Sequence, residues 1–97
     1  MIQKLKKNEV LKALKKLKNW AVIKNQLQKN FSFKNFIEAM AFVTQVSLLS
    51  ESMNHHPDIN IQYSKVTLTL STHSAKGLTQ LDFLLAEKID FLTHEKT

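Results

Sequence analysis

Apolar and polar positions repeat along the chain with two spacings, and each spacing predicts one kind of secondary structure. Apolar side chains three or four residues apart form one face of a helix, which predicts helices in residues 8–18, 35–53 and 79–92. Shorter apolar segments, several of them strictly alternating, are typical of strands and occupy residues 20–24, 27–33, 59–63 and 66–71. The order α-β-β-α-β-β-α predicts an α+β fold, a four-stranded antiparallel sheet with helices packed on one face.

Residues that favour helix starts and stops support this division. Helix-capping residue types precede or open all three predicted helices, namely Asn8, the pair Asn35 and Glu38, and the pair Thr79 and Asp82. Pro57 prevents the second helix from continuing. The chain has 97 residues, so we expect residues 1–97 to form a single domain.

The helix predicted over residues 35–53 has an unusually wide apolar surface. Its apolar residues form two neighbouring stripes, one of Phe36, Met40 and Val43, and one of Ala39, Phe42, Val46, Leu49 and Met53. A common amphipathic helix has a single stripe. The second stripe therefore predicts either a deeply buried helix or a helix that packs on the sheet and also on another subunit. We expect a homodimer or homotetramer formed through this helix.

The charge of the chain is unevenly distributed. The net charge is +6, yet residues 1–34 hold ten Lys against the single acid Glu9, and residues 35–97 hold four Lys against seven acids. Such a basic segment can attract nucleic acid or an anionic membrane surface, but a solvated surface is the simpler interpretation. The absence of Arg counts against specific base reading, so we do not expect a nucleic-acid partner.

Composition excludes several classes of protein. Without Cys the chain has no disulfide framework, no iron–sulfur cluster and no catalytic thiol. One Gly is too few for a glycine-rich phosphate-binding loop. No apolar segment approaches the roughly 20 residues that span a bilayer, and no signal-peptide core follows the basic start. We therefore expect a cytoplasmic protein without a membrane segment.

Three histidines are predicted to meet at one edge of the sheet. His55 and His56 precede the third strand and His73 follows the fourth, and the start of one strand lies beside the end of its antiparallel neighbour. Imidazole gives and takes protons near neutral pH, so this edge is a candidate acid–base or ligand-binding site. Glu51, one helical turn before His55, is placed to orient an imidazole. A zinc site is the alternative, but the spacing lacks the usual ligand motifs.

The same residues belong to a longer pattern. Glu51-x-x-x-His55-His56-Pro57 is followed by Tyr63, Ser71-Thr72-His73, Gly77-Leu78 and Asp82, and is preceded by Trp20, Phe31-x-Phe33-x-x-Phe36 and Phe42. This pattern closely resembles the pterin-4a-carbinolamine dehydratases over nearly the whole chain. The resemblance implies the same element order. It also implies loss of water from 4a-hydroxytetrahydropterin to give quinonoid dihydropterin, without a metal or an organic cofactor.

The resemblance further implies a role for each matched residue. His55 and His73 would be the acid–base pair, and His56 would mainly hold the pterin. The predicted substrate-binding residues are Glu51, which would support His55 or the pterin ring, together with Asn54, Ser71, Thr72 and Asp82. Asp82 also stands at a helix-capping position.

Two positions depart from the animal members of the family. Asn54 replaces an Asp, which keeps a hydrogen bond but loses a charge, and Ile59 replaces a Trp, which weakens stacking at the pocket rim. Animal members also stabilise the dimer of a transcription factor. The alternative function is therefore a protein-interaction module that uses the same fold and the broad apolar helix.

Overall fold

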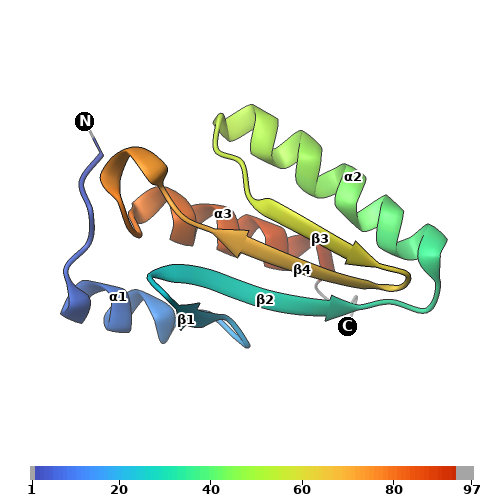
Figure 1. Cartoon of the computed structure of the whole chain (residues 1–97), viewed down its shortest axis with the longest axis horizontal. Coiled ribbons are helices and arrows are strands. Elements are labelled where there is room, and N and C mark those ends of the chain that lie inside the picture. The colour runs from blue at the N-terminus through green and yellow to red at the C-terminus, as the bar shows by residue number, and fades with distance from the viewer. Residues whose placement is uncertain (1, 94–97) are drawn as a thin grey trace.

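The computed structural model describes residues 2–93, and its secondary structure follows the predicted order (Figure 1). The helices are α1 (Lys7–Leu14), α2 (Phe36–Met53) and α3 (Gln80–Thr93), with a short 3-10 turn η1 at His73–Ala75. The strands are β1 (Ala21–Ile23), β2 (Gln26–Ser32), β3 (Asp58–Gln62) and β4 (Lys65–Leu70). The predicted α+β class and element order are confirmed.

The four strands form one antiparallel sheet in the order β1-β2-β4-β3. Leu27 pairs with Leu70 across β2 and β4, and Asp58 pairs with Thr69 across β3 and β4. Consequently β4 lies between β2 and the edge strand β3. Helices α2 and α3 lie against one face of the sheet, and the short α1 lies at the β1 end (Figure 1).

The core lies between the sheet and helices α2 and α3. Alternate residues of β2 and β4 supply one side, and the helices supply the other; the fully or nearly fully buried members are Leu27, Phe31, Val66, Leu68, Leu70, Ala39, Phe42, Val46, Leu85, Ala86 and Ile89. The rings of Phe31 and Phe42 lie 4.7 Å apart between centroids. Burial of this apolar surface is the main favourable term in folding.

One charged side chain, Lys29, shares the inward face of β2 and is neutralised there. Its Nζ lies 2.9 Å from Oδ1 of Asp90 on α3 and 4.9 Å from the ring centroid of Phe31. Trp20 Nε1 donates to the same carboxylate at 3.0 Å. A buried charge needs such partners. The ion pair between Lys29 and Asp90 also joins α3 to the sheet.

The first helix differs from its prediction. It starts at Lys7, not after an Asn8 cap, because the backbone N–H of Lys6 donates to Oε1 of Glu9 at 2.7 Å and places the start two residues earlier. It also ends at Leu14. Leu17 lies beyond the helix but still packs against the core, as do Val10 and Leu14.

The second helix starts as predicted and ends on a left-handed residue. Asn35 accepts from the backbone N–H of Glu38 at 2.8 Å, which confirms the predicted cap. At the other end Asn54 has φ 51°, a conformation that Asn tolerates better than most residues. The stripe of α2 that contains Ala39, Phe42 and Val46 faces the core, whereas Phe36 of the other stripe is exposed.

Strand β3 is less buried than its alternating pattern predicts. All five of its residues are exposed, and Ile59 and Ile61 each retain 36% of their accessible surface. The reason is its position at the edge of the sheet. Helix α2 packs over the neighbouring strand β4. Within residues 2–93 no helix combines the length and hydrophobicity needed to cross a membrane.

Candidate functional site

Three chain segments meet at one end of the sheet and bring the predicted site residues together. The α2–β3 connection carries His55 and His56, the segment after β4 carries Thr72 and His73, and the first turn of α3 carries Asp82. The antiparallel pairing of β3 with β4 places the first two segments side by side, and α3 begins at the same end (Figure 1).

His55 and Asp82 form the buried centre of this site. Nε2 of His55 lies 2.6 Å from Oδ1 of Asp82. His55 is 9% exposed and Asp82 is completely buried. This contact joins the end of α2 to the start of α3, two elements that are distant in sequence.

The other oxygen of Asp82 accepts two further hydrogen bonds. Thr72 Oγ1 donates to Oδ2 at 2.8 Å, and the backbone N–H of Thr79 donates to it at 2.9 Å. The Asp82 carboxylate is thus the acceptor in each of its contacts. Nε2 of His55 therefore carries a hydrogen, and Nδ1, which has no hydrogen-bond partner among residues 2–93, is the ring atom left for chemistry.

The hydroxyl groups of Thr72 and Thr79 support the Asp82 carboxylate at Oδ2, the oxygen that does not contact His55. The hydrogen of Thr72 points to Asp82, so the 2.8 Å contact between the Thr72 and Thr79 hydroxyls has Thr79 as its donor. Thr79 Oγ1 in turn accepts from the backbone N–H of Leu81 at 3.2 Å. Thr79 is thus a helix cap and a support of Asp82 at once.

His56 points away from this buried centre. Its Nε2 lies 2.9 Å from Oε1 of Glu51, and both side chains are exposed. Glu51 therefore pairs with His56 and not with His55. The reason is the left-handed turn at Asn54, which ends the helix. After this turn the backbone N–H of His55 donates to Ser50 O at 3.0 Å. The rings of His55 and His56 then face in opposite directions.

His73 follows Thr72 directly, in the segment after β4. It opens η1, its side chain is exposed, and the segment is closed by the pairing of Thr72 with Gly77. A small hollow of about 300 Å³ runs beside it, lined by Lys24, Asn25, Gln26, Ser71, Thr72, His73, Lys76 and Gly77. The half-buried Ser71 is therefore placed next to His73.

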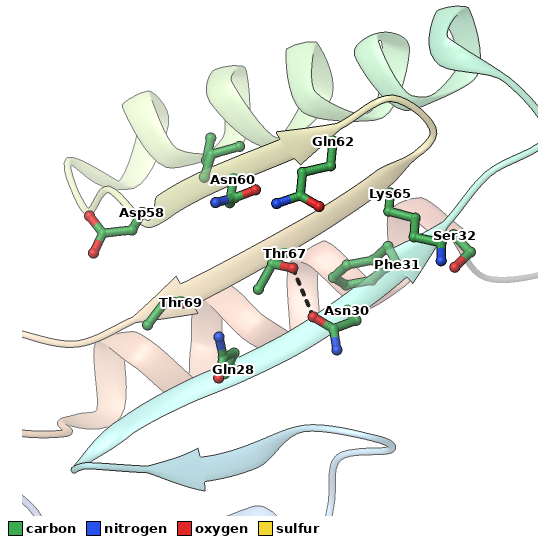
Figure 2. A pocket seen from close by; sticks show the side chains of 11 residues that line it. Gln28, Asn30, Phe31, Ser32, Asp58, Asn60, Gln62, Lys65, Thr67 and Thr69 are labelled. Carbon is green, nitrogen blue, oxygen red and sulfur yellow. Dashed lines mark hydrogen bonds between the residues drawn. The ribbon is translucent and has the colours of Figure 1, made fainter.

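A second, broader hollow lies on the sheet face that carries no helix (Figure 2). It measures about 740 Å³ and is lined mainly by amides, hydroxyls and two charged groups, among them Gln28, Asn30, Asn60, Gln62 and Thr67. Thr67 Oγ1 donates to Asn30 Oδ1 at 2.8 Å across the strands. No histidine lines this hollow, so it offers no acid–base group of that kind.

The structure brings most, but not all, of the predicted residues into contact. His55, Asp82 and Thr72 form one hydrogen-bonded group, and Glu51 with His56 forms a second. Asn54 is the exposed helix cap between them. Sequence reasoning placed Thr79 only as a cap; its capping-box spacing to Asp82 was the signal for its place in this group. Among residues 2–93 no three metal-ligating side chains converge.

Known proteins are similar to this chain over nearly its whole length. The model of the family described as pterin 4 alpha carbinolamine dehydratase matches residues 3–92. A Sulfolobus acidocaldarius protein is 44% identical over 90% of this chain and 96% of its own length. A Picosynechococcus protein is 46% identical over 95% of this chain and all of its own length. Both relatives bear the name pterin-4-alpha-carbinolamine dehydratase as a provisional assignment.

Two solved structures share the fold. A Brucella melitensis protein described as a transcriptional coactivator/pterin dehydratase superposes with a TM-score of 0.90 at 34% identity, covering 93% of this chain and 98% of its own. A pterin dehydratase-like RuBisCO assembly factor of the alpha-carboxysome superposes with a TM-score of 0.64 at 24% identity, covering 79% of this chain and 89% of its own. The second likeness shows the fold alone.

Proposed function

The chain belongs to the pterin 4 alpha carbinolamine dehydratase family, and we propose that it removes water from 4a-hydroxytetrahydropterin by histidine acid–base catalysis. The product is quinonoid dihydropterin, so the reaction would serve the recycling of tetrahydrobiopterin. The observation that carries the mechanism is the 2.6 Å contact between His55 and the buried Asp82. It fixes the tautomer of His55, while His56 and His73, on the same and the neighbouring segment, are exposed.

Dehydration needs one group to accept a proton and another to donate one. A base takes the hydrogen of the ring nitrogen next to the carbinol carbon, the carbon–oxygen bond breaks, and an acid protonates the departing hydroxyl to give water. His55 suits the base, because Asp82 holds its Nε2 hydrogen and stabilises the imidazolium that forms when Nδ1 takes a proton. Each such proton transfer contributes about 10²–10⁴-fold in rate.

His73 suits the acid and His56 the binding of the pterin. The side chain of His73 is exposed and free to exchange its proton with water between turnovers. His56 is held by Glu51 at 2.9 Å, and a carboxylate that accepts from one ring nitrogen leaves the other directed outward. Ser71 and Thr72 lie on the same segment as His73 and would line the pocket, while Asn54 at the turn is a further pterin contact.

The test is a dehydration assay on freshly generated 4a-hydroxytetrahydropterin, followed by ultraviolet absorbance. We expect wild-type protein to accelerate dehydration, and His55→Gln and His73→Gln each to lower kcat by about 100-fold. Gln is chosen at position 55 because Ala would leave the buried Asp82 without a donor. Gln62→Ala, on the open sheet face, is the matched control and should keep the full rate. Folded His variants with the wild-type rate would disprove the mechanism.

Helix α2 supports a homo-oligomer as the state of the enzyme. Its outward face carries Ile37 and Leu48, which are 76% and 69% exposed, with Ala41 and Thr44 between them on the same side. Exposed apolar residues in such a row are typical of protein interfaces. We propose that a second copy of α2 covers this row, in a dimer or a tetramer.

A second candidate function, a protein-interaction module, rests on the same outward face of α2. The Brucella melitensis relative is described as a coactivator as well as a dehydratase, and the carboxysome protein as an assembly factor. A partner protein bound at Ile37 and Leu48 would leave the histidine site intact. Absence of dehydration by folded wild-type protein would favour this function over the enzyme.

A further inference from the structure

Two lysines line the small hollow beside His73, and a third, Lys4, lies against Gly77 of the same loop. Lys24 lies in the β1–β2 turn and Lys76 follows η1, and both line the hollow. Lys4 comes from the N-terminal segment, whose backbone is joined to the loop by a 2.8 Å hydrogen bond from Leu5 N to Leu78 O. The lining of the hollow therefore holds two cationic side chains from distant parts of the chain.

Lys24 and Lys76 both occupy left-handed backbone conformations, with φ values of 52° and 59°. This conformation is unfavourable for a residue with an ordinary side chain, and Gly or Asn adopts it at lower cost. Two lysines that line one hollow thus occupy positions where another residue type would be more stable. The two-residue turn between β1 and β2 and the end of η1 impose these conformations.

Gly77 makes room for the third lysine. A Cβ atom at Gly77 would lie only 2.7 Å from Cε of Lys4, so the Lys4 side chain runs across the glycine and its ammonium lies one bond further on. Gly77 itself lines the hollow. The φ of Gly77 is not positive, and the end of the Lys4 side chain occupies the space beside it.

The positive charges at the hollow are not balanced by protein carboxylates. The eight lining residues include no Asp or Glu. Within residues 2–93 none of Lys4, Lys24 and Lys76 forms an ion pair, unlike Lys29 with Asp90. Ser71 and the amides of Asn25 and Gln26 add neutral hydrogen-bonding groups, whereas the Thr72 hydroxyl already donates to Asp82. Ammonium and hydroxyl donors together suit a compact, multiply charged anion such as phosphate.

We propose that this hollow binds a phosphate group carried on the side chain of the pterin substrate. The proposal rests on the proposed dehydratase function, because it places the reacting ring at the histidines and its charged side chain next to His73. The substrate class is then a phosphorylated 4a-hydroxytetrahydropterin. The same positive charges would also steer an anionic substrate toward the site at low ionic strength.

The test compares two pterins and two matched double variants. Lys24→Asn with Lys76→Asn removes two charges and keeps residues that accept the left-handed conformation. Lys18→Asn with Lys34→Asn removes two charges from exposed loops elsewhere. We expect the first double variant to lower kcat/KM for the phosphorylated pterin about tenfold, the size of two lost surface ionic contacts. The rate with the neutral pterin, and both rates of the control variant, should stay unchanged.

Inorganic phosphate separates failure of this proposal from failure of the dehydratase. We expect phosphate to shift the backbone amide NMR signals of Lys76 and Gly77 in wild type, and not in the Lys24→Asn, Lys76→Asn variant. Binding without any turnover would retain the anion site and reject the dehydratase function. Turnover of both pterins with equal kcat/KM, or phosphate shifts that persist in the double variant, would overturn the proposal. A tricarboxylate that binds as tightly as phosphate would also overturn it.

Discussion

Nε2 of His55 lies 2.6 Å from Oδ1 of Asp82, although 27 positions separate the two residues. The same carboxylate accepts the backbone N–H of Thr79 at the start of α3. One buried group therefore caps a helix and holds the proposed catalytic base. As a result, changes at this carboxylate should affect the free energy of unfolding and the rate together.

Asp82→Asn should change the tautomer of His55, so that the hydrogen moves from Nε2 to Nδ1. The amide oxygen would accept from Thr79 and Thr72, which turns the amide N–H₂ toward His55 and forces Nε2 to become an acceptor. The base atom Nδ1 is then protonated, and we expect kcat to fall by about 100-fold. The free energy of unfolding should fall by about 2 kcal/mol.

Two measurements check this variant. Nitrogen-15 NMR reports which ring nitrogen of His55 carries the hydrogen, and urea unfolding reports the stability. A variant that keeps hydrogen on Nε2, or that dehydrates the pterin at the wild-type rate, would contradict the proposed role of Asp82.

Thr79→Val and Thr79→Ser form a matched pair that tests the hydroxyl chain. Val removes the hydroxyl that donates to Thr72 and accepts from Leu81, so we expect a loss of about 1 kcal/mol in unfolding free energy. Because Asp82 then loses lateral support, kcat should fall about tenfold with KM near that of wild type. Ser keeps the hydroxyl and should restore both values. If Val and Ser give the same kcat, Thr79 is only a structural cap.

Asp90→Ala should destabilise the protein without touching the histidine site. The substitution leaves the side chain of Lys29, which is only 13% exposed, and Trp20 Nε1 without their acceptor. We expect a loss of about 2–3 kcal/mol in chemical denaturation. Adding Lys29→Met should recover part of it, because Met fits the apolar surroundings of Phe31 and carries no charge. A double variant less stable than Asp90→Ala would refute this account of the ion pair.

Ile37→Lys with Leu48→Lys tests the outward face of α2. Both side chains are exposed, so the subunit should stay folded while repulsion between lysines separates the copies. Light scattering after size-exclusion chromatography should show a lower mass than wild type. Asn60→Lys, on the open sheet face, is the control and should leave the mass unchanged. Phe42→Lys is unsuitable for this purpose, because Phe42 is a core residue and we expect a buried charge there to unfold the chain.

Local patterns along the chain determined most of the fold. The three- and four-residue spacing found α2 and α3, alternation found β4, and capping chemistry located Asn35 and Thr79 correctly. These features depend on neighbours within one or two turns of chain, which the sequence displays directly. The antiparallel order then indicated that the histidine segments share one end of the sheet.

Features that depend on a neighbouring element were missed or misjudged. Alternation in β3 predicted a half-buried strand, but burial depends on what covers a strand, and β3 lies at the edge. Asn8 is a favourable helix-capping residue type, yet the N-cap is Lys6, whose backbone N–H donates to Glu9. The β1–β2 turn lies at Lys24 and Asn25, one residue earlier than predicted.

The histidine site shows the same division. The sequence by itself determined which residue types gather at this end of the sheet, because strand order and spacing suffice for that. Only the tertiary structure decided that His55 turns inward to Asp82, that His56 pairs with Glu51, and that Lys24 lines one hollow with His73. Ring directions and charge partners are chosen by packing between segments tens of residues apart, where burial makes an unpaired polar group costly.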